Sequence, residues 1–265
     1  MLIDLEQRYA NFNGMNLTWE MLEGIAKHNG PQIGPNCKKE NTNIILLDYD
    51  QKYQFQLADF ASAEAQISSI SDDIAYVSHD LDDGLRANLF NIEDLKCLSL
   101  IGDIIKEKIK TYPNIAVSKI LHESIRKLIS IMIEDVFTQF TSNVKDNKIN
   151  SVEEIRKLGK PLVSFSPNIE LVNLELKQFL HKRVYRYYKV NRIWSKTKRI
   201  VHELFDFFMD HTNCLPTDWS TKVDSCNDLR MKAIVICDFI AGMTDRFAIK
   251  EHRRIFDTSY EMNVF

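Results

Sequence analysis

Residues 61–89 read ASAEAQISSISDDIAYVSHDLDDGLRANL, and this stretch decides the fold. If the stretch is helical, its apolar residues recur every three or four positions and form one continuous stripe. The stripe consists of Ile67, Ile70, Ile74, Val77, Leu81 and Leu85. This spacing predicts a long amphipathic helix that packs against the core through one face.

The opposite face of the same helix carries charge of one sign. At about 100° per residue, this face gathers Asp72, Tyr76, His79, Asp80 and Asp83. Between residues 53 and 85 there are seven acidic residues and no Lys or Arg. A solvated helix usually mixes both signs, because opposite charges one turn apart stabilise it. Two interpretations stay open at this point, a site for a cation such as a metal ion and a plain acidic surface.

Composition narrows the class of protein. The chain has 265 residues and a net charge of -3, so bulk charge neither favours nor excludes a nucleic-acid partner. Its five cysteines are scattered without a Cys-x-x-Cys pair, which argues against a zinc knuckle or a disulfide framework. No segment reaches the roughly 18 apolar residues of a membrane span. We therefore expect a soluble cytoplasmic protein with no membrane contact.

Helical periodicity continues along most of the chain and predicts an all-α fold. Amphipathic segments cover residues 91–112 and about 117–144, and residues 166–202 also have helical spacing. Residues 161–166 (PLVSFS) are the only plausible extended piece, and residues 215–227 are expected to form a loop. Residues suited to helix N-caps precede four of the predicted helices. They are Thr18, Asn91, Ser151 and Ser166.

A second stretch, residues 176–202, is as basic as the first is acidic. It contains nine Lys and Arg residues and no acid, with Tyr185, Tyr187, Tyr188 and Trp194 interleaved. In a regular helix Lys177, His181 and Tyr185 would share one face and could bind phosphate and a nucleoside. Two other interpretations are packing of the basic helix against the acidic one and binding of nucleic acid. Charge alone favours simple packing.

Four motifs together resemble one known family. They are SDDIAYVSHDLDDGLRANL (71–89), MNLTW (15–19) with KHNGP (27–31), LKQFLHKRVYR (176–186) and CDFIAGMTDRFA (237–248). In their order along the chain they resemble the deoxyguanosinetriphosphate triphosphohydrolase-like branch of the HD-domain phosphohydrolases. The resemblance implies an all-α fold, with the distal part of an HD-type core at residues 1–115. A phosphohydrolase-associated helical region would follow at residues 116–265. It also implies hydrolysis of a deoxynucleoside triphosphate (dNTP) to deoxynucleoside and triphosphate by metal-activated water.

The resemblance also implies roles for single residues on the acidic helix. Asp72 matches the family's last metal ligand. Tyr76, one turn later, matches the residue placed against the sugar and base of the nucleotide. Asp80, two turns later, matches the acceptor for the 3′-hydroxyl of the sugar.

Three residues of the basic stretch receive roles by the same resemblance. Lys177 and His181 would face the phosphates of the dNTP. Tyr185 would lie against the sugar. The expected substrate-binding set is therefore Tyr76, Asp80, Lys177, His181 and Tyr185, with Asp72 as the one metal ligand.

The sequence departs from the family pattern at the other metal ligands. The family uses an upstream His and a His-Asp pair, followed by a catalytic His, and no such segment is found. The one His-Asp dipeptide, His79-Asp80, lies inside the distal motif, and His28 is interpreted as a helix-end residue. We therefore assign no catalytic residue with certainty, and expect Mg²⁺ or Mn²⁺ not to be held by this chain alone.

Two explanations for the departure stay open. The chain is the C-terminal portion of a split or truncated hydrolase, completed by an N-terminal half or by another copy in a homo-oligomer. Alternatively, it is a catalytically inactive nucleotide-binding or interaction module derived from that family.

Overall fold

The computed structural model describes residues 2–3, 8–34, 40 and 42–259, and within them it contains helices and no strand. The all-α prediction is confirmed. The helices are α1 (Trp19–Ala26), α2 (Ile44–Tyr53), α3 (Ala63–Arg86), α4 (Ile92–Lys96), α5 (Ser99–Thr111), α6 (Val117–Asp146), α7 (Val152–Arg156), α8 (Pro167–Leu180), the π-helix η2 (His181–Tyr185), α9 (Tyr188–Asp210), the 3₁₀-helix η3 (Thr212–Cys214), α10 (Thr217–Asp224), α11 (Leu229–Ala241) and α12 (Asp245–Phe256). None of those described is long and apolar enough to cross a membrane.

The chain divides into two compact units, residues 2–185 and residues 186–265. The predicted boundary at residue 115 falls between α5 and α6, which pack against each other inside the first unit. The predicted boundary separates two family regions, whereas the two units are separated by compactness alone. The boundary at residue 115 therefore stays a prediction.

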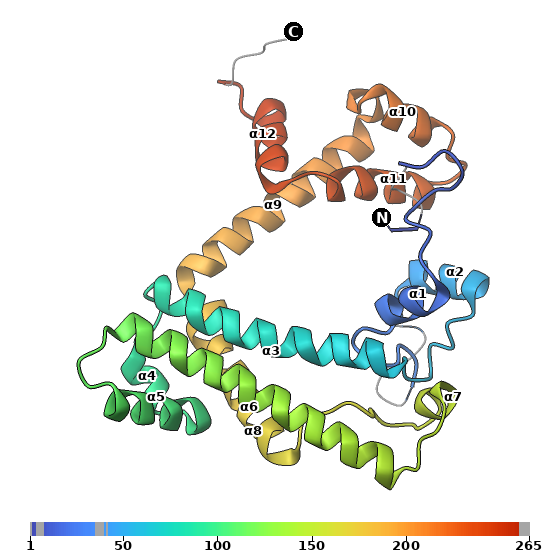
Figure 1. The fold of residues 1–265 in the computed structure, drawn as a ribbon. Coiled ribbons are helices and arrows are strands. Elements are labelled where there is room, and N and C mark those ends of the chain that lie inside the picture. The colour runs from blue at the N-terminus through green and yellow to red at the C-terminus, as the bar shows by residue number, and fades with distance from the viewer. Residues whose placement is uncertain (1, 4–7, 35–39, 41, 260–265) are drawn as a thin grey trace. The chain divides into compact units, whose positions relative to one another are not determined.

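The first unit is organised around α3, as the opening stretch predicts. The helix begins after Ser62, whose hydroxyl accepts a hydrogen bond from the Ala65 amide, and it ends at Arg86. It runs beside α6 (Figure 1). Its stripe residues Val77 and Leu81 are fully buried among side chains of α5, α6 and α8. Each such side chain contributes about 1.5–3 kcal/mol by leaving water, so burial of the stripe fixes which face of α3 points outward.

Gly84 lies inside α3 and lets the following segment fold back onto the helix. A Cβ at this position would lie 2.3 Å from Cε1 of Phe90, a buried core residue. Glycine is therefore required here by the close approach of a ring and not by a bend.

A smaller apolar cluster holds α1 against the segment that follows α2. It is built on Leu22, Phe55 and Leu57, and the indole of Trp19 donates a 2.7 Å hydrogen bond to the Tyr53 carbonyl.

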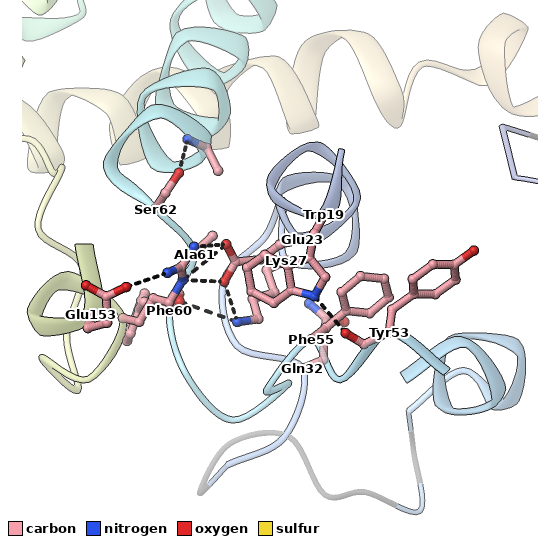
Figure 2. Close-up of polar contacts among 12 residues, drawn as sticks. Trp19, Glu23, Lys27, Gln32, Tyr53, Phe55, Phe60, Ala61, Ser62 and Glu153 are labelled. Carbon is pink, nitrogen blue, oxygen red and sulfur yellow. Dashed lines mark hydrogen bonds and ion pairs between the residues drawn. The ribbon is translucent and has the colours of Figure 1, made fainter. Parts of the chain in front are cut away.

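Beside this cluster lies a buried ion network centred on Glu23. Its carboxylate accepts from Lys27 Nζ at 3.0 Å and from Arg156 Nε at 2.9 Å. Figure 2 shows Lys27 between Glu23 and the Phe60 carbonyl. The network joins α1 to α7 across a large separation in sequence.

The segment predicted to be extended, residues 161–166, is not a strand. Its backbone is bound by side chains instead of by a neighbouring strand. Gln66 accepts hydrogen bonds from the amides of Leu162 and Val163, and Asn143 donates to the Leu162 carbonyl. The prediction was wrong because an apolar run of this length does not reveal which groups will pair with its backbone.

The second unit packs α9, α10, α11 and α12 around its own core, which includes Leu204, Phe208, Val223 and Ile236. The prediction of a loop at residues 215–227 was wrong, because α10 lies within it and buries Val223. This short helix has one buried side chain, too few for a periodic apolar signal.

Candidate functional site

Tyr76 and Asp80 occupy successive turns of α3 on its outward side. The Tyr76 side chain is half exposed, at 47%. Its pKa is raised above the ordinary tyrosine value, chiefly because of partial burial and next because of the Asp80 charge, while Lys177 opposes the rise. Lys177 belongs to α8, so side chains from two helices influence the same phenol.

Lys177 and Tyr185 bring the end of α8 to this face of α3. Lys177 Nζ donates a 2.9 Å hydrogen bond to Oδ2 of Asp73, the residue next to Asp72. The ring of Tyr185 stacks on that of Tyr76, with centroids 6.0 Å apart and planes inclined by 18°. Four of the predicted substrate-binding residues, Tyr76, Asp80, Lys177 and Tyr185, thus lie on α3, α8 and the π-helix η2 that follows α8.

The backbone that carries Tyr185 is not a regular α-helix. After Leu180 the chain forms the π-helix His181–Tyr185, in which each hydrogen bond spans one more residue than in an α-helix. The expected single α-helical face through Lys177, His181 and Tyr185 is therefore corrected. His181 begins the π-helix with an exposed side chain, and Tyr185 ends it with its ring against α3.

Two polar atoms of this group are buried without a hydrogen-bond partner among the described residues. They are Oδ2 of Asp80 and the hydroxyl of Tyr185. Nearly all buried polar atoms in native proteins are satisfied, so each exception calls for an explanation. A bound ligand with hydroxyl groups would supply a donor to the carboxylate and a partner to the phenol.

Asp80 is also electrostatically unusual. Burial raises the pKa of its carboxyl above the ordinary aspartate value, the neighbouring charge of Asp83 raises it further, and His79 opposes the shift. In the folded chain the charged form of Asp80 is therefore penalised. A donor from a ligand would relieve that penalty.

Asp72 lies at the edge of this group, with its side chain 74% exposed and Oδ2 3.6 Å from Nε2 of His28. A divalent ion is the cofactor that the resemblance implies, and a carboxylate with an imidazole is a suitable pair of donors. No group of three or more His, Cys, Asp or Glu residues gathers as a metal site within the described ranges. The described residues therefore do not form a complete metal site, and we assign no reaction step to a metal.

Sequence reasoning missed two residues at this location. His28 was expected only to end a helix, yet its imidazole faces Asp72 and borders a cavity of about 290 Å³. Asp73 was not singled out, yet it binds Lys177 and lines the same cavity. His28 lies in KHNGP, one of the motifs that resemble the family, so the sequence could have pointed to it. Only the fold shows that this loop lies beside α3.

Tyr185→Phe tests whether the phenol hydroxyl has a structural role in the free protein. Because the hydroxyl is buried without a partner, its removal should leave the melting temperature unchanged or raise it. Thermal unfolding of the variant beside Tyr112→Phe, which alters an exposed tyrosine, checks this. A melting temperature clearly below that of the control would show that the hydroxyl is satisfied in the folded chain.

Comparison with known proteins gives the family context for this geometry. Residues 163–254 match the model of the phosphohydrolase-associated domain. The chain is 43% identical to a deoxyguanosinetriphosphate triphosphohydrolase-like protein of Parvibaculum lavamentivorans, over 96% of this chain and 64% of that protein. Proteins of the same name from Rickettsia rickettsii and a Caulobacter species are 43% and 41% identical, over 97% of this chain and 65% and 64% of theirs.

The alignments cover almost all of the chain, while the chain spans somewhat under two thirds of the length of these relatives. Over nearly its whole length, the chain is therefore homologous to the deoxyguanosinetriphosphate triphosphohydrolase-like proteins.

Proposed function

We propose that α3 and the α8–π-helix segment form the sugar- and phosphate-binding wall of a dNTP triphosphohydrolase site. The observation that carries the proposal is the stacked pair Tyr76–Tyr185, accompanied by two buried polar atoms without partners. Tyr76 would flank the sugar and base, and Tyr185 would meet the sugar through its free hydroxyl. Asp80 would accept a hydrogen bond from the 3′-hydroxyl.

Lys177 and His181 would face the phosphates in this arrangement. Lys177 is paired with Asp73 in the free chain, but the two side chains are 37% and 47% exposed. Ion pairs exposed to this degree contribute at most about 1 kcal/mol. A triphosphate carries more negative charge than one carboxylate, so it can draw the ammonium group away from Asp73.

Hydrolysis would need more than the described residues provide. Asp72, with His28 beside it, would be one contribution to binding of Mg²⁺ or Mn²⁺. Further ligands would come from residues that the structure does not describe, from a complementing N-terminal segment or from a second copy of the chain. The whole enzyme's reaction, release of triphosphate from dGTP or another dNTP, is therefore proposed for the completed site.

Thermal unfolding with and without each dNTP tests the binding wall. A ligand at one hundred times its Kd stabilises a folded protein by about 2.7 kcal/mol, so a saturating cognate dNTP should raise the melting temperature by several degrees. Inorganic triphosphate and deoxynucleoside, added separately, should each give part of the shift. If no dNTP changes the melting temperature, the proposal is wrong.

A non-catalytic nucleotide-binding module is the second candidate function, favoured by the absence of a three-residue metal cluster from the described ranges. A chromatographic assay for triphosphate release with Mn²⁺ or Mg²⁺ separates the two. Release that disappears in Asp72→Ala supports the hydrolase. Stabilisation by dNTP without release supports the binding module, and release that persists in Asp72→Ala removes Asp72 from the site.

A further inference from the structure

A cavity of about 350 Å³ lies between α3 and α6, the two helices that run side by side in the first unit (Figure 1). None of the residues assigned to the dNTP site lines it. Its lining consists of Ser78, His79 and Asp82 from α3 and His122, Ile125, Arg126 and Ile129 from α6. Asp82 and His122 also line a neighbouring cavity of about 440 Å³.

Two of the lining residues have a buried polar atom without a hydrogen-bond partner among the described residues. These atoms are Oγ of Ser78, a residue that is 2% exposed, and Oδ1 of Asp82. A serine inside a helix can donate to the carbonyl four residues earlier, as Ser124 does to Ile120. Ser78 makes no such bond. Because buried polar atoms are nearly always satisfied, a ligand in this cavity would account for both exceptions.

Asp82 has one carboxylate oxygen available to such a ligand. Its Oδ2 accepts a 2.8 Å hydrogen bond from Nε of Arg86, whose side chain is 65% exposed. Its Oδ1 lies 3.8 Å from Nδ1 of His122, which is too far for a hydrogen bond. Water screens an exposed ion pair, so the carboxylate still attracts a cation from the side of the cavity.

The other cation of the lining does not compete for this oxygen. Arg126 lies one turn from His122 on α6, but its guanidinium pairs with Glu123 at 2.5 Å, and its side chain is 73% exposed. The attraction of Asp82 therefore remains for a ligand.

The polar atoms of the cavity match one kind of group. The Asp82 oxygen, the Ser78 hydroxyl and an unprotonated Nδ1 of His122 can all accept a hydrogen bond. An ammonium group has three donors, no acceptor and a positive charge, so it suits three acceptors of which one is a carboxylate. Ile125 and Ile129 add an apolar wall, which suits methylene groups attached to the nitrogen.

We propose that the α3–α6 cavity binds a primary alkylammonium ion, the chemical class of the diamines and polyamines. Its nitrogen donates to Asp82 Oδ1 and His122 Nδ1 at about 2.9 Å each, because two acceptors that share one donor group can be 3.8 Å apart. Ser78 accepts the third hydrogen, and the alkyl chain lies against Ile125 and Ile129. This binding does not depend on the proposed dNTP site.

Isothermal titration calorimetry of the full chain with n-butylamine tests the proposal at constant ionic strength and neutral pH. Two comparison ligands have the same alkyl chain. 1-Butanol lacks the charge, and butyltrimethylammonium has the charge but no N–H group. Butylamine should bind at least tenfold more tightly than either, because hydrogen bonds to charged groups are the strong ones. Equal affinity for butylamine and either comparison ligand would overturn the proposal, as would no binding of butylamine.

Substitutions in the cavity should weaken the binding of butylamine. We expect Asp82→Asn to weaken it at least tenfold and Ser78→Ala at least threefold. His122→Lys should abolish it, because the new side chain brings its own ammonium group to Asp82. Asp103→Asn is the matched control, since Asp103 is an exposed carboxylate of α5 that pairs with Lys106 at 3.1 Å. It should bind butylamine as the wild type does, and equal weakening in Asp103→Asn and Asp82→Asn would overturn the proposal.

Titration with Mn²⁺ distinguishes an ammonium site from a metal site. Binding of Mn²⁺ that Asp82→Asn abolishes, without binding of butylamine to the wild type, would make the cavity a metal site and overturn the proposal. Thermal unfolding of each variant is recorded first. Ser78→Ala removes a buried hydroxyl that has no partner, so it should melt no lower than the wild type. If Asp82→Asn does not fold, Ser78→Ala and His122→Lys decide the outcome, and unchanged binding of butylamine in both would overturn the proposal.

Discussion

Glu23→Gln is expected to destabilise the first unit by about 3–5 kcal/mol, the loss measured when one partner of a buried ion pair is removed. Glu23 and the Lys27 side chain are fully buried, and the Arg156 side chain is 12% exposed. The Glu23 hydrogen bond raises the pKa of Arg156 against the opposing effect of burial. Without the carboxylate, Lys27 would remain buried without an acidic partner, and Arg156 would keep only its pairing with the exposed Glu153.

Urea unfolding of Glu23→Gln beside Glu153→Gln measures this effect. Glu153 also pairs with Arg156, at 3.7 Å, but its side chain is 72% exposed. Its replacement should therefore change the free energy of unfolding by about 1 kcal/mol or less. Similar losses for the two variants would contradict the account of a buried network.

The network also lies next to residues of the proposed site. Lys27 is followed by His28, whose imidazole faces Asp72, and both Lys27 and His28 line the cavity beside Asp73. Glu23 therefore holds the end of α1, and with it His28, beside Asp72 and Asp73. In Glu23→Gln the end of α1 should be less firmly held. A dNTP should therefore stabilise this variant less than it stabilises the wild type, measured where the variant is still folded.

The parts of this fold that depend on local sequence could be predicted. The stripe of α3 is buried at Ile74, Val77 and Leu81 and partly buried at Ile70 and Leu85, whereas Ile67 is exposed. Thr18, Asn91 and Ser166 cap helices through their side chains. Caps and stripes are set by residues three or four positions apart, so they can be recognised within a short window.

The Glu23 network could not be predicted, because Glu23 and Arg156 are 133 residues apart and neither has an unusual neighbour in sequence. The π-helix also escaped prediction, since a π-turn has no spacing signal that distinguishes it from an interrupted α-helix. The resemblance implied that Tyr76 and Tyr185 each lie against the nucleotide sugar, but the contact between their two rings was not predicted.

Asp80→Asn is the second change expected to have a large effect, and it should act on stability and on binding in opposite directions. In the free chain the variant should melt above the wild type at neutral pH, because burial and Asp83 penalise the charged carboxylate. Its dNTP affinity should fall about tenfold or more, since hydrogen bonds to charged groups contribute about 1.5–3 kcal/mol. Few substitutions both raise the melting temperature and weaken ligand binding. Such substitutions lie at binding sites where a charged group is unfavourable in the free protein and is stabilised by the ligand.

The pH dependence of the stability gain follows from the direction of the pKa shift. The pKa of Asp80 is higher in the folded chain than in the unfolded chain, so the penalty on the wild type grows as the pH rises above the unfolded pKa and is complete above the folded pKa. The penalty is absent below the ordinary aspartate pKa, near 4. The stability gain of Asp80→Asn should therefore be larger at pH 7.5 and shrink as the pH falls toward about 4.

Thermal unfolding of the wild type and Asp80→Asn, each with and without the dNTP that stabilises the wild type most, tests the central claim most directly. At one hundred times the wild-type Kd, the ligand should stabilise the wild type by about 2.7 kcal/mol and a tenfold weaker variant by about 1.4 kcal/mol. Asp103→Asn, an exposed carboxylate on α5, should behave as the wild type in both measurements. A lower melting temperature for free Asp80→Asn, together with undiminished stabilisation by the dNTP, would contradict the account.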